Sequence, residues 1–303
     1  MTDAAFDRWA RQQLDAVEAA LDIWVPAEAP AGLGQAMRYG VLDGGKRLRP
    51  LLVLAACSAV DGDREAALRA AVAVELIHAY SLVHDDMPCM DNDVLRRGKP
   101  TVHVQYGQAQ AMLAGDAMQA LAFEVLTPDA ASGHAAAVIE PALQAQLTGL
   151  LARAAGHAGM AGGQAIDLAS TGCHLDEAAL CDMHRRKTGA LLQASVLMGA
   201  ACGRTGASTW QCLSEYGAAV GLAFQVVDDI LDVTQASETL GKTAGKDQDH
   251  NKPTYVSVLG VGAARDHAHA LRSQAHAALR RSGIGDAGAL LGVLADRVVE
   301  RES

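Results

Sequence analysis

Two short clusters of aspartate residues carry the clearest chemical signal in this 303-residue chain. The first runs from Asp85 to Asp91 (DDMPCMD) and the second from Asp228 to Asp232 (DDILD), each within an apolar, helix-forming stretch. A carboxylate on the apolar side of a helix is costly to desolvate unless a partner compensates its charge. Mg²⁺ prefers oxygen ligands and typically binds one or two carboxylates together with phosphate oxygens. The clusters therefore predict a site that holds magnesium and, through it, a diphosphate.

Basic residues occur in short groups that are suited to binding phosphates directly. These groups are Lys46/Arg47/Arg49, Arg96/Arg97/Lys99, Arg185/Arg186/Lys187 and Lys242/Lys246/Lys252. The formal net charge of -10 argues against a nucleic-acid partner, because binding a polyanion requires an extended basic surface. We therefore interpret the basic groups as local contacts within a pocket for a small phosphorylated ligand.

The spacing of the second cluster predicts that its aspartates share one helix face. Asp228 and Asp232 are four residues apart, which places both carboxylates on one face about 6 Å apart. Gln225 precedes Asp228 by roughly one turn on the same side. The alternative is a solvated acidic face, which the apolar residues around the motif disfavour.

The first cluster cannot form one helical ridge. Pro88 disfavours helical geometry at Met87, and a six-residue step on an ideal helix would point Asp91 about 120° away from Asp85. The helix must therefore bulge near its end to bring Asp91 back beside Asp85, or Asp91 lies in a loop. A calcium loop over residues 91–93 is disfavoured, because the glycine and the distal glutamate of an EF-hand are missing.

Composition favours an all-α fold. Half of the residues are apolar, only 4% are aromatic, and alanine is frequent, which suits closely packed helices better than sheets. No linker-like stretch divides the chain, so we expect one domain over residues 1–303. Apolar spacing predicts helices over residues 6–24, 33–42, 51–60, 64–86, 109–126, 135–155, 166–168, 180–202, 209–233, 263–281 and 287–300, and no strand-period segment.

The compartment is also predicted from the sequence. Asp3 and Asp7 stand where a secretory signal would need positive charge, and we find no apolar run of the ~20 residues that a membrane span requires. The six cysteines include no CxxC pair, which is typical of reduced thiols. We therefore expect a cytoplasmic protein that does not span a membrane.

Taken together, the motifs resemble the trans-isoprenyl diphosphate synthases, and most of all bacterial farnesyl diphosphate synthase. From about residue 30 to 260 they are GGKRLRP (44–50), HAYSLVHDD (78–86), LRRGKPT (95–101), GGQAIDL (162–168), KTGALL (187–192), FQVVDDILD (224–232) and LGKTAGKD (240–247). One departure is Val94, where many relatives carry a further acidic residue. The resemblance implies an isoprenoid-synthase-type bundle of about ten or more helices around a central cavity, usually as a homodimer.

The resemblance also implies residue roles. Three magnesium ions would be held by Asp85, Asp86, Asp91, Asp167, Asp228 and Asp232. The allylic diphosphate would contact Arg96, Lys187 and Lys242, and the isopentenyl diphosphate would contact Lys46, Arg49, His78 and Arg97, with Lys252 as a further substrate-binding residue. Thr188 and Gln225 would stabilise the allylic cation. Solvated positions are the alternative for Arg47, Arg186, Lys99 and Lys246, and a core position is the alternative for His84.

The implied reaction is a head-to-tail condensation. Isopentenyl diphosphate would react with dimethylallyl and then geranyl diphosphate to give farnesyl diphosphate and pyrophosphate. Tyr80 and Ser81 lie roughly 6 to 7.5 Å before Asp85 along the helix axis, where a ring should stop further growth of the product. The alternatives are a geranylgeranyl diphosphate synthase, a non-catalytic subunit of a heteromeric synthase, which the two intact motifs disfavour, and a terpene cyclase, which has no use for a second diphosphate clamp.

Overall fold

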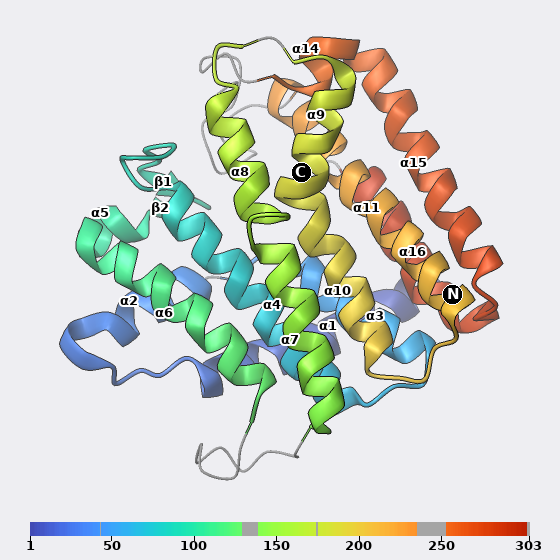
Figure 1. The fold of residues 1–303 in the computed structure, drawn as a ribbon, viewed down its shortest axis with the longest axis horizontal. Helices are drawn as coiled ribbons and strands as arrows, with labels where there is room; N and C mark the ends of the chain where they lie inside the picture. The colour runs from blue at the N-terminus through green and yellow to red at the C-terminus, as the bar shows by residue number, and fades with distance from the viewer. Residues whose placement is uncertain (43, 129–138, 174, 235–252, 302–303) are drawn as a thin grey trace.

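The protein is almost entirely helical over the residues that the structure, a computed structural model, describes: 1–42, 44–128, 139–173, 175–234 and 253–301 (Figure 1). Its α-helices are α1 (Asp3–Trp24), α2 (Leu33–Val41), α3 (Leu48–Ala59), α4 (Arg64–Asp85), α5 (Val102–Tyr106), α6 (Gln108–Leu126), α7 (Pro141–Ala155), α8 (Met160–Ala169), α9 (Glu177–His184), α10 (Ala190–Ala201), α11 (Ala207–Thr234), α14 (Tyr255–Leu259), α15 (Val261–Arg281) and α16 (Ala289–Val299). The predicted all-α class is confirmed.

The remaining elements are short. They are the 3₁₀ turns η1 (Pro30–Gly32) and η3 (Gly285–Gly288), the π-helical turn η2 (Arg185–Gly189), and a hairpin of β1 (Leu95–Arg96) and β2 (Lys99–Pro100). The predicted helix 180–202 is therefore wrong in detail, because η2 separates α9 from α10. The predicted 166–168 segment is only the end of α8. The hairpin, α5 and α14 were missed because two to five residues are too few for an apolar period.

Helix α4 lies in the middle of the molecule. In Figure 1, α2, α5 and α6 lie on one side of it and α11, α15 and α16 on the other, with α3 and α10 between. One apolar core is formed mainly by α1, α2, α4, α6 and α7, and a second mainly by α3, α10, α11, α15 and α16. The two aspartate motifs thus sit on helices of different cores, and α3 and α10 hold these helices at a fixed separation.

Local sequence explains where the first and central helices begin. Thr2 caps α1 by accepting from the Ala5 N–H at 3.3 Å. Asp63 caps α4 by accepting from the N–H of Glu65 at 2.9 Å. Since α4 ends at the first aspartate cluster, this cap helps to set the cluster's position along the helix axis.

Helix α4 corrects one expectation. It is long and apolar enough to cross a membrane by length and composition, and it is the one such helix in the described ranges. The expectation that no run reaches this length is therefore wrong for α4, whose few charges are too widely spaced to interrupt it. Within the protein, 72% of the apolar window is buried, as in the core helix of a helical bundle.

Candidate active site

The first aspartate cluster lies at the end of α4. Asp85 is the last residue of the helix, and the chain then turns back so that the N–H of Asp91 donates to the Asp85 carbonyl at 2.9 Å. A parallel bond of 3.0 Å joins the Asp93 N–H to the Asp86 carbonyl. Of the two alternatives, Asp91 lies in the turn that follows the helix, and this turn brings its backbone back beside Asp85.

The Asp85 carboxyl has an unusual protonation equilibrium. Burial raises its pKa from 3.8 to about 6; the charge of Lys187 opposes the rise, and the charge of Asp91 adds to it. Burial and mutual repulsion both favour the protonated acid, so a nearby divalent cation would stabilise the ionised pair. The two carboxylates therefore fit a hard metal ion.

The donor set around this pair indicates how such an ion would be bound. Among the side chains that the structure describes, no group of three or more His, Cys, Asp or Glu is placed to hold a metal alone. Mg²⁺ usually keeps several waters and combines one or two carboxylates with phosphate oxygens. The pair Asp85 and Asp91 fits this pattern of ligands.

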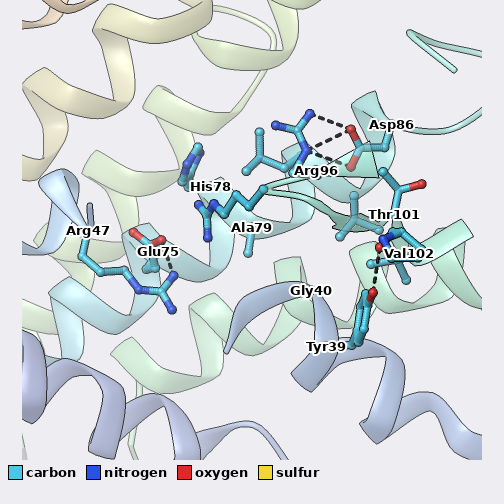
Figure 2. A pocket seen from close by; sticks show the side chains of 14 residues that line it. Tyr39, Gly40, Arg47, Glu75, His78, Ala79, Asp86, Arg96, Thr101 and Val102 are labelled. Carbon is cyan, nitrogen blue, oxygen red and sulfur yellow. Dashed lines mark hydrogen bonds and ion pairs between the residues drawn. The ribbon is translucent and has the colours of Figure 1, made fainter. Parts of the chain in front are cut away.

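The buried Asp86 forms an ion pair with the half-buried Arg96 (Figure 2). The Nε and Nη2 of Arg96 donate to the two carboxylate oxygens of Asp86 at 2.6 to 3.0 Å. Burial lowers the pKa of Arg96, but its hydrogen bonds to Asp86 outweigh this effect and the pKa lies above its ordinary value. The hairpin β1–β2 carries Arg96 to this position. A predicted metal ligand and a predicted diphosphate contact are thus already neighbours.

Arg97 connects the hairpin to the loop that precedes α3. It adopts a φ of 52°, and its Nη1 donates to the carbonyl of Gly44. Arg97, His78 and Arg96 line one small cavity of about 40 Å³. The structure therefore brings the basic residues after the first motif beside the GGKRLRP loop, although about 50 residues separate them in the chain.

Lys187 pairs with Asp167 across a close helix contact. Its Nζ donates to Oδ2 of Asp167 at 2.5 Å, and Asp167 is buried. Helix α8 can approach this closely because of Gly163, where a Cβ would lie 2.1 Å from the Lys187 nitrogen. Asp167 follows Gly163 by about one helical turn, so the same close approach delivers its carboxylate to Lys187.

A chain of hydrogen bonds joins the π-helical turn η2 to the second motif. The Thr188 hydroxyl donates to Oε1 of Gln225 at 2.8 Å, and Nε2 of Gln225 donates to Asp229 at 2.8 Å. The other oxygen of Asp229 accepts from the Tyr255 N–H at 2.7 Å. Gly221 permits this approach, because a Cβ there would lie 2.8 Å from the nearest Cα of η2. The orientation of the Gln225 amide is therefore set by its partners.

Asp228 also holds a cation. Arg301 donates to its Oδ1 at 2.6 Å and to the Phe224 carbonyl at 2.8 Å. Burial lowers the pKa of Lys46, the charge of Arg301 lowers it further, and the charge of Asp228 raises it. Lys46 thus lies within electrostatic reach of the second motif. Asp232, the other predicted ligand on this face, is buried.

The predicted isopentenyl clamp includes the buried Arg49 and the half-buried His78. The Nε of Arg49 is buried and has no hydrogen-bond partner in the described structure. Burial lowers the pKa of Arg49, whereas the charges of Glu75 and Asp228 raise it. The pKa of His78 lies well below 6.5, because the ring is buried and because Arg49 and other arginines are close. A cationic, incompletely bonded site of this kind is suited to an anion.

Arg47 is buried, so the alternative interpretation, in which it is solvated, is wrong. Only 4% of it is exposed. Its three nitrogens donate to Glu18 at 2.7 Å, to Glu75 at 2.7 Å and to the Val41 carbonyl at 2.6 Å. Both glutamates are remote in sequence, which is why neighbouring residues gave no indication of this burial.

A larger cavity of about 370 Å³ gathers many of the predicted residues. Those that line it include Arg49, His78, Tyr80, Ser81, Asp85, Lys187 and Thr188. The ring of His84 packs edge-on against Tyr80, with centroids 5.7 Å apart, and also lines the cavity. The predicted chain-length residues therefore share a cavity with Asp85, a predicted metal ligand, and with His84.

Some predicted residues are not part of this lining. Gln225 is linked to the cavity by its hydrogen bond with Thr188, which lines it. Asp228 affects the cavity electrostatically, because its charge raises the pKa of Arg49. Lys242, Lys246 and Lys252 lie outside the described residues. Sequence reasoning missed Asp229 as a partner of Gln225, although its place inside DDILD was a usable signal. It also missed Arg301, for which no motif gave a signal.

Comparisons with known proteins agree with this geometry. The family model described as polyprenyl synthetase matches residues 30–282. Geranylgeranyl pyrophosphate synthase 9 (chloroplastic) of Arabidopsis thaliana is 47% identical over 267 residues, which is 87% of this chain and 73% of that protein. Farnesyl diphosphate synthase of Geobacillus stearothermophilus is 41% identical over 305 residues and covers all of both chains.

A solved structure extends the comparison to three dimensions. The geranyltransferase of Helicobacter pylori, complexed with magnesium and isoprenyl diphosphate, is 32% identical and has a TM-score of 0.82, covering 96% of this chain and 95% of that one. The family match spans most of the sequence, and the solved structure shares the fold. The chain therefore belongs to the polyprenyl synthetase family of prenyltransferases.

Proposed function

We propose that the protein is a farnesyl diphosphate synthase that condenses isopentenyl diphosphate with dimethylallyl and then geranyl diphosphate. In each step the allylic C1–O bond ionises, the isopentenyl double bond attacks C1, and a proton is lost, with the departing pyrophosphate as its acceptor. The cavity of about 370 Å³ carries the proposal, because Asp85, Lys187 and Thr188 line it together with the ring of Tyr80.

Magnesium would be held by the six predicted carboxylates, Asp85, Asp86, Asp91, Asp167, Asp228 and Asp232. When bound, as three ions, it would neutralise the diphosphate leaving group. Three of these carboxylates already hold a cation, in the pairs Asp86–Arg96, Asp167–Lys187 and Asp228–Arg301. A magnesium diphosphate could separate such a pair without leaving either charge unpaired. The carboxylate would then bind the metal, and the arginine or lysine would bind a phosphate oxygen.

Protein dipoles would stabilise the allylic cation. Positive charge spreads over C1 and C3 as the diphosphate departs, and an amide oxygen or a hydroxyl can face it without attacking it. Thr188 lines the cavity, and Oε1 of Gln225 accepts a hydrogen bond from its hydroxyl, so both oxygens would be fixed beside the allylic position that we propose. The buried surroundings would exclude water that would otherwise trap the cation.

The second substrate would bind between Lys46, Arg49, His78 and Arg97. The unpartnered Nε of Arg49 would donate to its diphosphate. Because the pKa of His78 lies well below 6.5, its ring is neutral near pH 7 and contributes a hydrogen bond rather than a charge. Arg96, Lys187 and Lys242 would contact the allylic diphosphate instead, so the two substrates would use separate cations.

Product length is the finer part of the proposal. Tyr80 is 9% exposed, and it lines the cavity one to two helical turns below Asp85. The full-length similarity to a farnesyl diphosphate synthase supports a short product. The specific alternative is geranylgeranyl diphosphate, which the name of the 47% identical plant relative favours.

A product assay tests the proposal. We expect the purified protein to convert dimethylallyl and isopentenyl diphosphates to farnesyl diphosphate, identified by mass, and to lose this activity in EDTA and regain it with Mg²⁺. A main product of geranylgeranyl diphosphate would favour the alternative. Absence of prenyl transfer by the chain alone would contradict the proposed function and favour a role as a non-catalytic subunit.

We also propose a cytoplasmic homodimer with a single domain over residues 1–303. Bacterial relatives of similar length support this description, whereas the plant relative is chloroplastic by name. Size-exclusion chromatography with light scattering would measure the oligomeric state.

A further inference from the structure

The loop before α3 contains an arginine whose contacts the proposed reaction does not use. Arg47 stands between Lys46 and Arg49, two proposed contacts of isopentenyl diphosphate, yet each of its own nitrogens donates to a protein oxygen. It is 4% exposed. Figure 2 shows Arg47 joined to Glu75, with His78 nearby and the Arg96–Asp86 pair beyond it.

The backbone at Arg47 is strained. Its φ of 44° and ψ of 38° lie in the left-handed region, which a residue other than glycine adopts only when its surroundings determine it. The same residue precedes the first turn of α3, and its carbonyl accepts from the Leu51 N–H at 3.1 Å. The chain direction at Arg47 therefore decides where Lys46 and Arg49 stand relative to each other.

The contacts of Arg47 come from three helices. Glu18 belongs to α1, Val41 ends α2, and Glu75 belongs to α4, one turn before His78. Burial lowers the pKa of Arg47, but the hydrogen bond of Glu18 and the charge of Glu75 raise it above its ordinary value, so the side chain stays charged. A planar guanidinium can serve three acceptors in different directions at once, which a lysine cannot.

We propose that Arg47 is a positioning residue that, through Glu18 and Glu75, fixes the loop so that Lys46 and Arg49 bind the diphosphate of isopentenyl diphosphate. Glu18 lies in α1, before residues 30–282, the part that matches the family model. The inference rests on the proposed function, since it assumes that Lys46 and Arg49 bind this substrate.

The direction in which one substitution changes the affinity for isopentenyl diphosphate distinguishes a positioning role of Arg47 from direct contact with the substrate. Glu18→Gln removes a negative charge beside a site for an anion, so electrostatics alone would tighten substrate binding. If Arg47 bound the diphosphate itself, releasing it from Glu18 would also tighten binding. If Arg47 positions the loop, the loss of its 2.7 Å ion pair with Glu18 weakens binding. Glu18 is 38% exposed, so the variant should fold.

The measurements use the full chain with Mg²⁺. We expect Glu18→Gln to raise the KM for isopentenyl diphosphate about three- to tenfold and to leave the KM for dimethylallyl diphosphate within about twofold. Isopentenyl diphosphate has no allylic partner when added alone, so calorimetry without the second substrate gives its Kd directly. The Kd should rise by the same factor. Arg47→Lys should act in the same direction, because its ammonium cannot keep all three contacts.

A matched control comes from the same helix. Asp22 of α1 pairs with Arg38 and not with Arg47, so Asp22→Asn removes one charge from α1 without touching the loop. We expect both KM values to stay unchanged. An unchanged or lower KM and Kd for isopentenyl diphosphate in Glu18→Gln would overturn the inference. A wild-type chain without prenyl transfer would instead contradict the proposed function, so the two failures are distinguishable.

Discussion

Arg301 donates a 2.6 Å hydrogen bond to Asp228, although 73 residues separate them in the chain. The guanidinium also lies over the ring of Phe224, 4.1 Å from its centroid. Asp228 is one of the proposed magnesium ligands, so a protein cation already occupies one oxygen of this carboxylate. Arg301 and the metal therefore compete for one carboxylate.

Replacing Arg301 should ease the binding of magnesium. Asp228 is 41% exposed, and an ion pair of this exposure contributes at most about 1 kcal/mol, so we expect Arg301→Gln to lower the half-saturating Mg²⁺ concentration about two- to fivefold. The measurement is a Mg²⁺ titration of turnover at saturating substrates. Arg297→Gln is the control, because Arg297 binds Asp3 and Asp7 at the surface. A higher requirement for magnesium in Arg301→Gln would contradict this competition.

Tyr80→Ala should lengthen the product. The ring is mostly buried in the lining of the 370 Å³ cavity, so its removal leaves space for a longer prenyl chain. We expect geranylgeranyl diphosphate to become the main product, as identified by mass. Tyr106→Ala is a suitable control, since Tyr106 packs edge-on against Tyr39 and is absent from the cavity lining. An unchanged product in Tyr80→Ala would remove Tyr80 as the determinant of length.

Asp85 should make stability depend on pH and on magnesium together. The pKa of Asp85 is about 6 in the folded protein and 3.8 in an unfolded chain. Between pH 3.8 and about 6 the folded protein therefore keeps a proton on Asp85 that the unfolded chain has lost. Stability without metal should therefore fall as the pH rises from about 4 to 6, and it stays lower above that range. Magnesium binds the ionised form, so it should raise the Tm more at about pH 7.5 than at about pH 5.

Differential scanning calorimetry with and without Mg²⁺ would measure both effects. The variant Asp85→Asn cannot ionise, and it should lose this part of the pH dependence together with most of the magnesium effect. Equal Tm shifts by magnesium at the two pH values would be incompatible with Asp85 as a ligand.

Asp229 should affect the rate through Gln225. It accepts from Nε2 of Gln225 and from the Tyr255 N–H, so asparagine can satisfy only one of these donors. We expect Asp229→Asn to lower kcat about tenfold or more, with both KM values within about threefold, because the amide oxygen beside Thr188 loses its fixed orientation. Asp182→Asn, at an exposed pair with Arg186, is the control. A change in KM alone would indicate a role in binding instead.

The sequence was sufficient where the signal was local. Apolar periodicity located most of the long helices, and Pro88 indicated that α4 could not continue regularly to Asp91, which lies in the turn after it. The spacing in DDILD put Gln225 and Asp228 on one helix. These conclusions depend on steric and periodic rules that act within one or two helical turns.

The sequence was insufficient where partners are remote. Arg47 looked like Lys46 and Arg49, because the glutamates that bury it are 28 and 29 residues away. The role of Gly163 also depends on a remote partner, because it lies inside α8, where the absence of a Cβ lets the helix touch Lys187. The need for a glycine at this position becomes visible only in the packing of α8 against η2.

The wide turn at η2 makes the number of residues between α9 and α10 matter as much as their identity. One residue corresponds to about 100° of rotation in a regular helix. A natural deletion within residues 185–189 would therefore swing the ammonium of Lys187 away from its acidic neighbour while every recognisable motif survived. For homologues whose alignments open a single-residue gap here, motif inspection alone would overestimate catalytic competence.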